Sequence, residues 1–280
     1  MEKERIIQYY DHCEQDYRLF WDLDHSHAMH AGYWDAQTST LRQALRRENE
    51  ILAEKVGIKF SDHVLDAGCG VGGSAIFLAQ QYSCQVKGIT LSAKQVETAR
   101  RKAAAAKVNP LPVFEVMDYA RTRFEDHTFD VVWGVESVCH APDKKLFLEE
   151  AARVMKPGGR LIVADGFAMR KAYTGRDAIQ MSRWLRGWGV DSLETVDSFY
   201  SHLIQAGFTN ISYENITTHV IPSSRRLYWY SWPAVSLSKC LELVGLRTSH
   251  QTENLVGARY QYITLKRNLW QYGIFKAERP

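Results

Sequence analysis

The alternation of short apolar runs with helix-spaced segments between residues 63 and 165 most constrains how this chain can fold. Runs rich in β-branched residues predict strands at residues 63–66, 86–90, 113–117, 130–135 and 160–165. Helical spacing predicts helices between them, at residues 74–81, 92–106 and 144–155. Strands that alternate with helices form a parallel, doubly wound α/β sheet, which binds ligands at the carboxyl ends of its strands.

The flanking segments extend this sheet and cover it. Helices are also expected at residues 41–56 and 196–206, and strands at residues 211–216 and 269–277. We expect residues 1–40 to form an N-terminal helical lid and residues 41–166 to form the cofactor-binding core. The rest divides into two helical substrate caps and the remainder of the core sheet: caps at 167–195 and 217–262, sheet at 196–216 and 263–280.

Two local patterns mark element boundaries. Ser92 and Gln95 match a Ser-x-x-Gln capping box, which predicts the start of a helix at this serine. Pro157-Gly158-Gly159 predicts a turn before the fifth strand.

Composition excludes several classes of protein. The chain has 280 residues, enough to bury a full core, and its net charge of +3 is too small and too dispersed to predict nucleic-acid binding. Its five cysteines are scattered and form no C-x-x-C, so neither a disulfide nor a zinc site is expected. The charged N-terminus predicts no signal peptide, and no apolar run is long enough to span a bilayer. We therefore expect a cytoplasmic protein, with peripheral membrane contact and homo-oligomerisation left open.

The glycine-rich stretch at residues 64–74 predicts a cofactor site. Gly68, Gly70 and Gly73 satisfy G-x-G-x-x-G, which alone also fits a nicotinamide dinucleotide enzyme. However, Asp66 ends the strand before the loop, where it would repel a pyrophosphate. Thr90 ends the next strand, where a nicotinamide ribose would require an acid. Both features favour S-adenosylmethionine, which has a sulfonium cation and no phosphate.

The residues expected to contact this cofactor lie at the ends of successive strands. Glycines let the backbone approach the ligand, Asp118 is a candidate acceptor for the adenine amino group, and Gln95 is a candidate for the ribose hydroxyls as well as a helix cap. The full set of predicted cofactor-binding residues is Asp66, Gly68, Cys69, Gly70, Thr90, Leu91, Gln95, Met117, Asp118, Tyr119 and Val135.

The same motifs resemble a known family. The stretches 64–73, 88–92, 130–133 and 153–159 are similar, in order and spacing, to those of class I S-adenosylmethionine-dependent methyltransferases. Within that class, residues 136–143 resemble sterol C-methyltransferases, and Gly-Ile-Thr-Leu-Ser at 88–92 is similar to tocopherol and cyclopropane-fatty-acid enzymes. Small natural-product O-methyltransferases share a Glu-Ser-x-x-His-x-Pro-Asp segment. The resemblance implies a seven-stranded Rossmann-like sheet and methyl transfer to a small molecule.

Glu136 and His140, just past the fourth strand, are the candidate catalytic residues. Methylation of an alkene carbon leaves a carbocation, which aromatic faces stabilise and a base must deprotonate. Glu136 is the first candidate for that carboxylate, whereas His140 would be the natural base for a hydroxyl acceptor. The candidate lid and substrate residues are aromatic or imidazole side chains: Tyr9, Tyr10, Tyr17, His30, Tyr33, Trp34, Tyr228 and Trp232. His25, His27 and His30 lack a completing ligand set, so no metal is expected.

The leading hypothesis is a methyltransferase of secondary metabolism that C-methylates a terpenoid, prenyl or sterol-like alkene. The first alternative is O- or N-methylation of a natural product with His140 as base. Two further alternatives are a pericyclase-like member that keeps the cofactor as a structural part, and a nicotinamide oxidoreductase.

Overall fold

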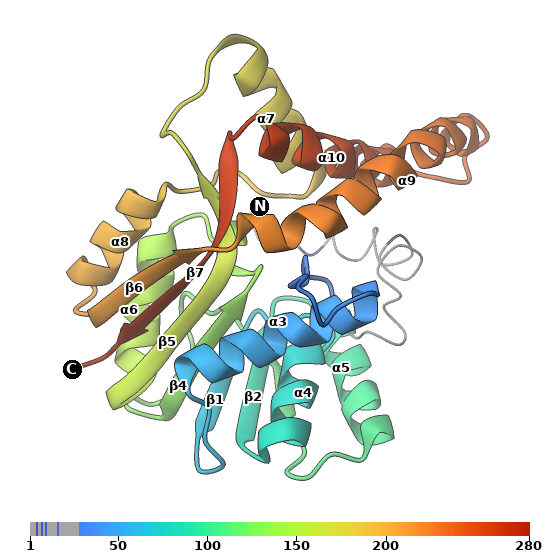
Figure 1. Ribbon diagram of the computed structural model, residues 1–280. Coiled ribbons are helices and arrows are strands. Elements are labelled where there is room, and N and C mark those ends of the chain that lie inside the picture. The colour runs from blue at the N-terminus through green and yellow to red at the C-terminus, as the bar shows by residue number, and fades with distance from the viewer. Residues whose placement is uncertain (1–3, 5–6, 8, 10–15, 17–27) are drawn as a thin grey trace.

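A seven-stranded sheet forms the centre of the computed structural model, which describes residues 4, 7, 9, 16 and 28–280 (Figure 1). The strands are β1 (His63–Ala67), β2 (Gln85–Thr90), β3 (Val113–Val116), β4 (Phe129–Val135), β5 (Met155–Ala168), β6 (Thr209–Asn215) and β7 (Trp270–Glu278). The helices are α3 (Leu41–Val56), α4 (Gly73–Tyr82), α5 (Ala93–Ala106), the 3-10 turn η1 (Val138–His140), α6 (Lys144–Val154), α7 (Gly175–Gly187), α8 (Val196–Gln205), α9 (Thr217–Leu243) and α10 (Ser249–Lys266). The predicted α/β architecture is confirmed.

The strand order places a ligand crevice at the middle of the sheet. The order is β3-β2-β1-β4-β5-β7-β6, and only β7 runs antiparallel to its neighbours. β1 pairs with both β2 and β4, so the winding of the chain reverses between β1 and β4. In an open α/β sheet such a reversal opens a crevice at the carboxyl ends of the two strands. The glycine loop follows β1, and Glu136 follows β4.

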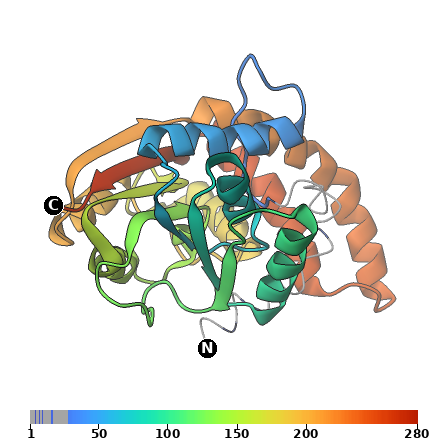
Figure 2. The same ribbon diagram turned by 90° about the horizontal axis from the view of Figure 1, so that it is seen from below.

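Two apolar layers sandwich the sheet. Successive strand residues point to opposite faces, so Val64 packs in the layer with α3, α4 and α5, whereas Leu65 packs in the layer with α6 and α8. In Figure 1 these two helix groups lie on opposite faces of the sheet, and α7, α9 and α10 stand above its carboxyl edge. Seen from below in Figure 2, α3 runs alongside the sheet. The third group of helices is therefore placed to roof the crevice.

Two local predictions are wrong, and a third is confirmed in part. The Pro157-Gly158-Gly159 turn is part of β5, because Gly158 and Gly159 pair with the backbone of Arg279 just after β7. The cap expected at residues 167–195 is helical only in α7, since β5 continues to Ala168. The helix start predicted at Ser92 is confirmed, because the Ser92 hydroxyl caps the Gln95 N–H, but Gln95 Oε1 accepts from Thr90 Oγ1 at 2.6 Å.

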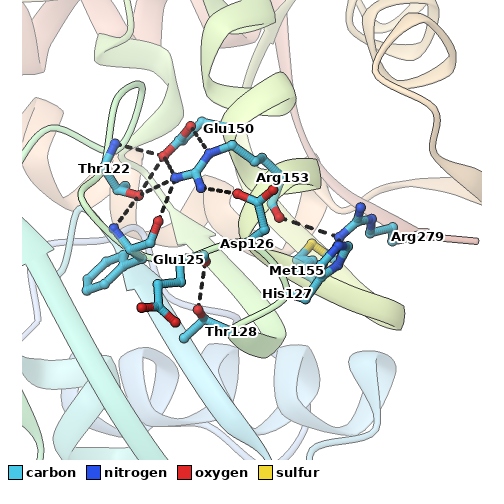
Figure 3. Close-up of polar contacts among 10 residues, drawn as sticks. Thr122, Glu125, Asp126, His127, Thr128, Glu150, Arg153, Met155 and Arg279 are labelled. Atoms are coloured by element: carbon cyan, nitrogen blue, oxygen red, sulfur yellow. Dashed lines mark hydrogen bonds and ion pairs between the residues drawn. The ribbon is translucent and has the colours of Figure 1, made fainter.

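An arginine cluster fastens the end of the sheet away from the crevice. Figure 3 shows Arg153 of α6 between Glu150 and Asp126, which it contacts at 2.7 Å and 2.5 Å. Arg153 also donates to the carbonyl of Phe124 at 2.9 Å. Arg279 reaches the Met155 carbonyl from the other side. These bonds join the loop before β4 to α6 and β7, and they leave the opposite end of the sheet to the functional site.

Candidate active site

A cavity with about 900 Å³ of empty space, partly open to solvent, lies over the glycine loop, at the carboxyl ends of β1, β2 and β4. We call it the glycine-loop cavity. Most of the predicted cofactor residues line it: Asp66, Gly68, Cys69, Gly70, Thr90, Leu91, Gln95, Tyr119 and Val135. The candidate catalytic residues Glu136 and His140 line it too. Sequence reasoning thus located one contiguous site from four separate loops.

Gly68 is required by close contact with the neighbouring loop. Its φ is +93°, and a Cβ added there would lie 2.3 Å from the Cβ of Ser137. Ser137 in turn donates to the carbonyl of Ala67 at 2.6 Å. The loops after β1 and β4 are therefore locked together, and no larger residue fits at the first glycine.

The side chain of Asp66 lines this cavity. The side chain is buried, and burial raises the pKa of its carboxyl to about 7, against a smaller opposing effect of a hydrogen bond from the backbone of Ala75. Its Oδ2 has no hydrogen-bond partner among the described residues. A buried acceptor without a partner is costly, so this atom is placed to accept from a bound ligand.

Two predicted cofactor residues do not line the cavity. Met117 is buried in the core, and its sulfur accepts from the Arg123 N–H at 3.4 Å. Asp118 accepts from the Ala120 N–H at 2.9 Å, which is a turn interaction. Tyr119 next to it does line the cavity, and its hydroxyl donates to the carbonyl of Ser137 at 2.9 Å. An adenine contact by Asp118 stays a prediction.

Glu136 is held at the back of the cavity by two hydrogen bonds to one oxygen. Its Oε1 lies 2.5 Å from the Ala31 N–H and 2.9 Å from the Tyr272 hydroxyl. Burial, followed by the charge of Glu48, raises the pKa of Glu136 well above its usual range. The side chain therefore ties the segment before α3 to the sheet in a form that favours the neutral acid.

Glu48 of α3 completes this buried group. Its Oε2 accepts from His30 Nδ1 at 2.6 Å and from the Gly32 N–H at 2.7 Å, and its Oε1 lies 2.8 Å from the Tyr272 hydroxyl. Burial opposes its charge, but His30 and these hydrogen bonds lower the pKa of Glu48. A phenol has one proton. Neutral Glu136 donating to Tyr272, and Tyr272 donating to ionised Glu48, satisfies all three groups.

His140 lies where the glycine-loop cavity meets a second cavity, which encloses about 570 Å³. Its Nδ1 is 3.3 Å from the carbonyl of Gly189, so this nitrogen holds the proton and Nε2 is the unprotonated one. Burial lowers the pKa of His140 to about 4. The imidazole is therefore neutral at physiological pH and is available as a base.

The second cavity, the tryptophan cavity, has aromatic walls. Trp184 and Trp270 stack with ring centroids 4.3 Å apart, and Tyr9, Trp188 and Tyr272 add further rings. Asp165 is one of its polar lining residues and accepts hydrogen bonds from the N–H groups of Cys139 and Gly166, both at 2.8 Å. Burial nevertheless raises the pKa of Asp165. Such a cavity suits a largely apolar molecule with a polar reacting group.

Several predicted lid residues lie elsewhere. Tyr33 stacks on His219 with centroids 4.0 Å apart, and Trp34 donates to Ser223 at 2.8 Å, both against the first turns of α9. Tyr228 packs against Tyr262, and Trp232 is exposed on α9. None of these four lines either cavity. Tyr9 and His30 do, whereas Tyr10, Tyr17, His25 and His27 lie outside the described residues.

Comparison with known proteins decides the family. Residues 65–163 match the family model of a methyltransferase domain. The 27-O-demethylrifamycin SV methyltransferase of Amycolatopsis mediterranei is 37% identical over 70% of this chain and 71% of its own length. The chain belongs to the S-adenosylmethionine-dependent methyltransferases.

Two further proteins resemble this methyltransferase along its whole length. The chloroplastic tocopherol O-methyltransferase of Arabidopsis thaliana is 28% identical, covering 98% of this chain and 82% of its own. A geranyl diphosphate methyltransferase, solved with geranyl diphosphate and sinefungin, superposes with a TM-score of 0.78 at 20% identity and covers all of both chains. The second likeness confirms the predicted Rossmann-like sheet.

S-adenosylmethionine is the methyl donor of this family, and the glycine-loop cavity fits it. A sulfonium–ammonium ligand requires acceptors without phosphate-binding cations, and the partnerless Oδ2 of Asp66 is such an acceptor. Thr90 and Gln95 supply polar groups on the far wall. Two residues that sequence reasoning missed, Ile7 and Met29, also line the cavity. Because they precede the glycine loop in the chain, no local motif marks them.

Other residues of this methyltransferase were missed for similar reasons. Glu48 reads as one of many charges on α3, and only its burial shows that it faces the site. Tyr272 lies on the last strand of the sheet, far from any motif. Asp165 did carry a signal, because it lies near the carboxyl end of the fifth predicted strand, where ligands bind.

Proposed function

We propose that this methyltransferase transfers a methyl group to a hydroxyl oxygen of a largely apolar natural product. The observation that supports this most is His140: a buried, neutral imidazole at the junction of the two cavities. A hydroxyl held in the tryptophan cavity would meet the base and the donor at one point. Positioning and proton removal are what methyl transfer to oxygen requires of a protein.

The residues divide this work as follows. When bound, S-adenosylmethionine supplies an electrophilic methyl group and leaves as a neutral thioether. Asp66 accepts from the polar end of the donor, and Gly68 lets the backbone approach it. His140 Nε2 takes the hydroxyl proton as the new C–O bond forms and the C–S bond breaks, and the proton then passes to solvent. The Gly189 carbonyl keeps Nδ1 protonated throughout.

Glu136 is assigned a positioning role in this proposal. Its raised pKa favours the neutral acid, which neither accepts a proton nor stabilises a cation. Its hydrogen bonds hold the Ala31 segment over the glycine-loop cavity. A curated relative adds support, since the tocopherol enzyme is named as an O-methyltransferase.

C-methylation of an alkene is the second candidate, and one observation favours it. Trp184 and Trp270, whose ring planes are tilted by 34°, line the tryptophan cavity, and aromatic ring faces stabilise cations. On this alternative a carboxylate must accept a proton from carbon, and Glu136 or Asp165 could do so only in its ionised form.

The test compares His140→Ala with Glu136→Gln on a panel of phenolic, macrocyclic-alcohol and prenyl acceptors with labelled donor. We expect His140→Ala to lower kcat by about 10²–10⁴-fold while donor affinity measured by calorimetry stays unchanged, and Glu136→Gln to retain most activity. The product should hold the label as a methyl ether. A C-methyl product, with Glu136→Gln the more damaging change, would establish the second candidate instead. S-adenosylhomocysteine released with no acceptor methylated would exclude both.

A further inference from the structure

Helix α9 buries four serines beside Val220, Leu227 and Val235, and it exposes several of its large apolar residues. The face that packs against α10 includes Ser224, Ser231 and Ser238, all nearly inaccessible to solvent. Ser238, for example, is hydrogen-bonded to Thr252 of α10 at 2.7 Å. A helix at the surface of a soluble protein normally turns its apolar face inward. The exposed apolar residues indicate that the outward face of α9 has an apolar environment of its own.

The outward face carries a broad apolar stripe. Trp229, Leu237 and Leu243 are 66%, 60% and 88% exposed, and Trp232 and the C-cap residue Val244 are exposed beside them. At about 100° per residue these positions fall on one half of the helix surface, together with the exposed Ser236 and Cys240. With a rise of 1.5 Å per residue the stripe is roughly 20 Å long. The α9–α10 hairpin projects beyond the rest of the molecule (Figure 1), so the stripe is not shielded by the sheet domain.

The charges around the stripe have one sign. Arg225 and Lys239 are exposed on α9 beside the apolar residues. The single acid of α9, Glu242, is turned to α10, where it accepts from Thr252 at 2.9 Å. Arg259 of α10 lies over the ring of Trp232, 4.0 Å from its centroid. A surface that complements this face has an apolar interior, which contacts the stripe, and anionic groups at its boundary, which contact the basic side chains.

We propose that the α9 stripe docks on an anionic lipid surface, with the helix lying in the plane of the interface. Helices that lie in a membrane interface have an apolar face flanked by Lys, Arg and Trp residues. They bury this face at the boundary between headgroups and acyl chains. None of the described helices is long and apolar enough to cross a bilayer. The occupant is therefore a lipid surface contacted from one side.

This docking would bring the tryptophan cavity close to a membrane. Gln261 of α10 lines that cavity, and α10 packs along α9. An apolar acceptor concentrates in lipid, so the hairpin would shorten its path to His140. The docking itself stands on the α9 face alone, and it is tested without any methyl acceptor.

The test is co-sedimentation of the full chain with lipid vesicles. We expect binding to phosphatidylcholine vesicles in which phosphatidylglycerol replaces a third of the lipid, weakened by added salt. Leu237→Gln with Leu243→Gln should lower the partition coefficient at least tenfold, because each leucine loses apolar burial in the interface. Lys239→Gln should lower it about fivefold on anionic vesicles and leave pure phosphatidylcholine unaffected.

Phe60→Gln is the matched control. Phe60 is 76% exposed but lies outside the stripe, between α3 and β1, so this variant should bind vesicles like the wild type. Circular dichroism and donor affinity should be the same for all variants. Absence of binding to anionic vesicles, or an equal loss in Phe60→Gln, would overturn the proposal. So would a dimer in light scattering that the double leucine variant converts to a monomer without changing vesicle binding, because a second copy would then cover the stripe.

Discussion

The ring of Tyr9 packs directly on Gly189, so closely that a methyl group added at this glycine would lie 3.3 Å from the tyrosine Cγ. The carbonyl of Gly189 is also the acceptor for His140 Nδ1. The Tyr9 hydroxyl is fixed in turn by Asn254 Oδ1 of α10 at 3.0 Å. One backbone unit thus links the N-terminal segment, the roof helices and the candidate base.

Gly189→Ala should therefore lower kcat by more than its loss of folding stability would cause. The φ of +65° costs an alanine about 1–2 kcal/mol, and the new methyl group pushes against Tyr9. We expect a fall in kcat of at least tenfold with unchanged donor affinity in calorimetry. Gly207→Ala is the control, since its φ is +87° and nothing lies within 4 Å of its added Cβ. If kcat falls equally in both variants, backbone strain alone explains the loss.

Asp66→Asn should change how stability depends on pH. The folded-state pKa of Asp66 is about 7, above its unfolded value of about 4. The folded protein binds the extra proton, so the contribution of this group to stability falls as pH rises from about 4 to 7 and stays low above that. The lost stability is on the order of 4 kcal/mol for this buried group.

The measurement is urea denaturation of the donor-free protein at pH 5 and pH 8. The free energy of unfolding of Asp66→Asn, minus that of the wild type, should be larger at pH 8 than at pH 5. The variant should also bind the donor more weakly. Other buried acids are unchanged in the variant, so the difference between the two proteins isolates Asp66. Parallel pH dependences would contradict the raised pKa.

Glu136→Ala and Glu136→Gln should separate on donor binding. The glutamine keeps an oxygen that accepts from the Ala31 N–H, whereas alanine leaves this buried donor without its side-chain partner. An unsatisfied buried donor costs about 1–3 kcal/mol, so Glu136→Ala should weaken donor affinity about tenfold or more. Calorimetry gives the affinity, and limited proteolysis near residue 31 reports release of the segment. Equal affinities for the two variants would remove the positioning role.

The pH profile of the reaction should be flat through neutrality. Burial lowers the pKa of His140 to about 4, so the neutral, proton-accepting form predominates above that value. We expect kcat/KM for a hydroxyl acceptor to decline only below about pH 5, measured in buffers where circular dichroism shows the fold intact. A rate that instead rises through pH 6 to 7 would mean that His140 titrates like an exposed imidazole.

The sequence predicts the fold and the donor site well because both depend on local patterns. β1, the glycine loop and α4 are adjacent in the chain, and β2 with Thr90 and Gln95 follows directly. The place of Asp66 at the end of β1 therefore follows from the sequence. Its missing hydrogen-bond partner does not, because that depends on everything packed around it.

The roof of the site is less predictable for a physical reason. Glu48, Glu136 and Tyr272 come from α3, the end of β4 and β7, and they meet only through the order of strands in the sheet. Aromatic density alone placed Tyr228 and Trp232 in the site, although α9 turns Trp232 to solvent. Which side of a helix faces the core depends on its partner, here α10, and not on its own composition.

The position of β7 has a consequence for how the molecule is made. This strand follows the other six in the chain, yet it lies between β5 and β6. Until β7 pairs, β6 has no neighbour in the sheet, and the acids Glu48 and Glu136 lack the Tyr272 hydroxyl that joins them. A chain emerging from the ribosome would therefore join α3 to the end of β4 through Tyr272 only after every other strand has formed.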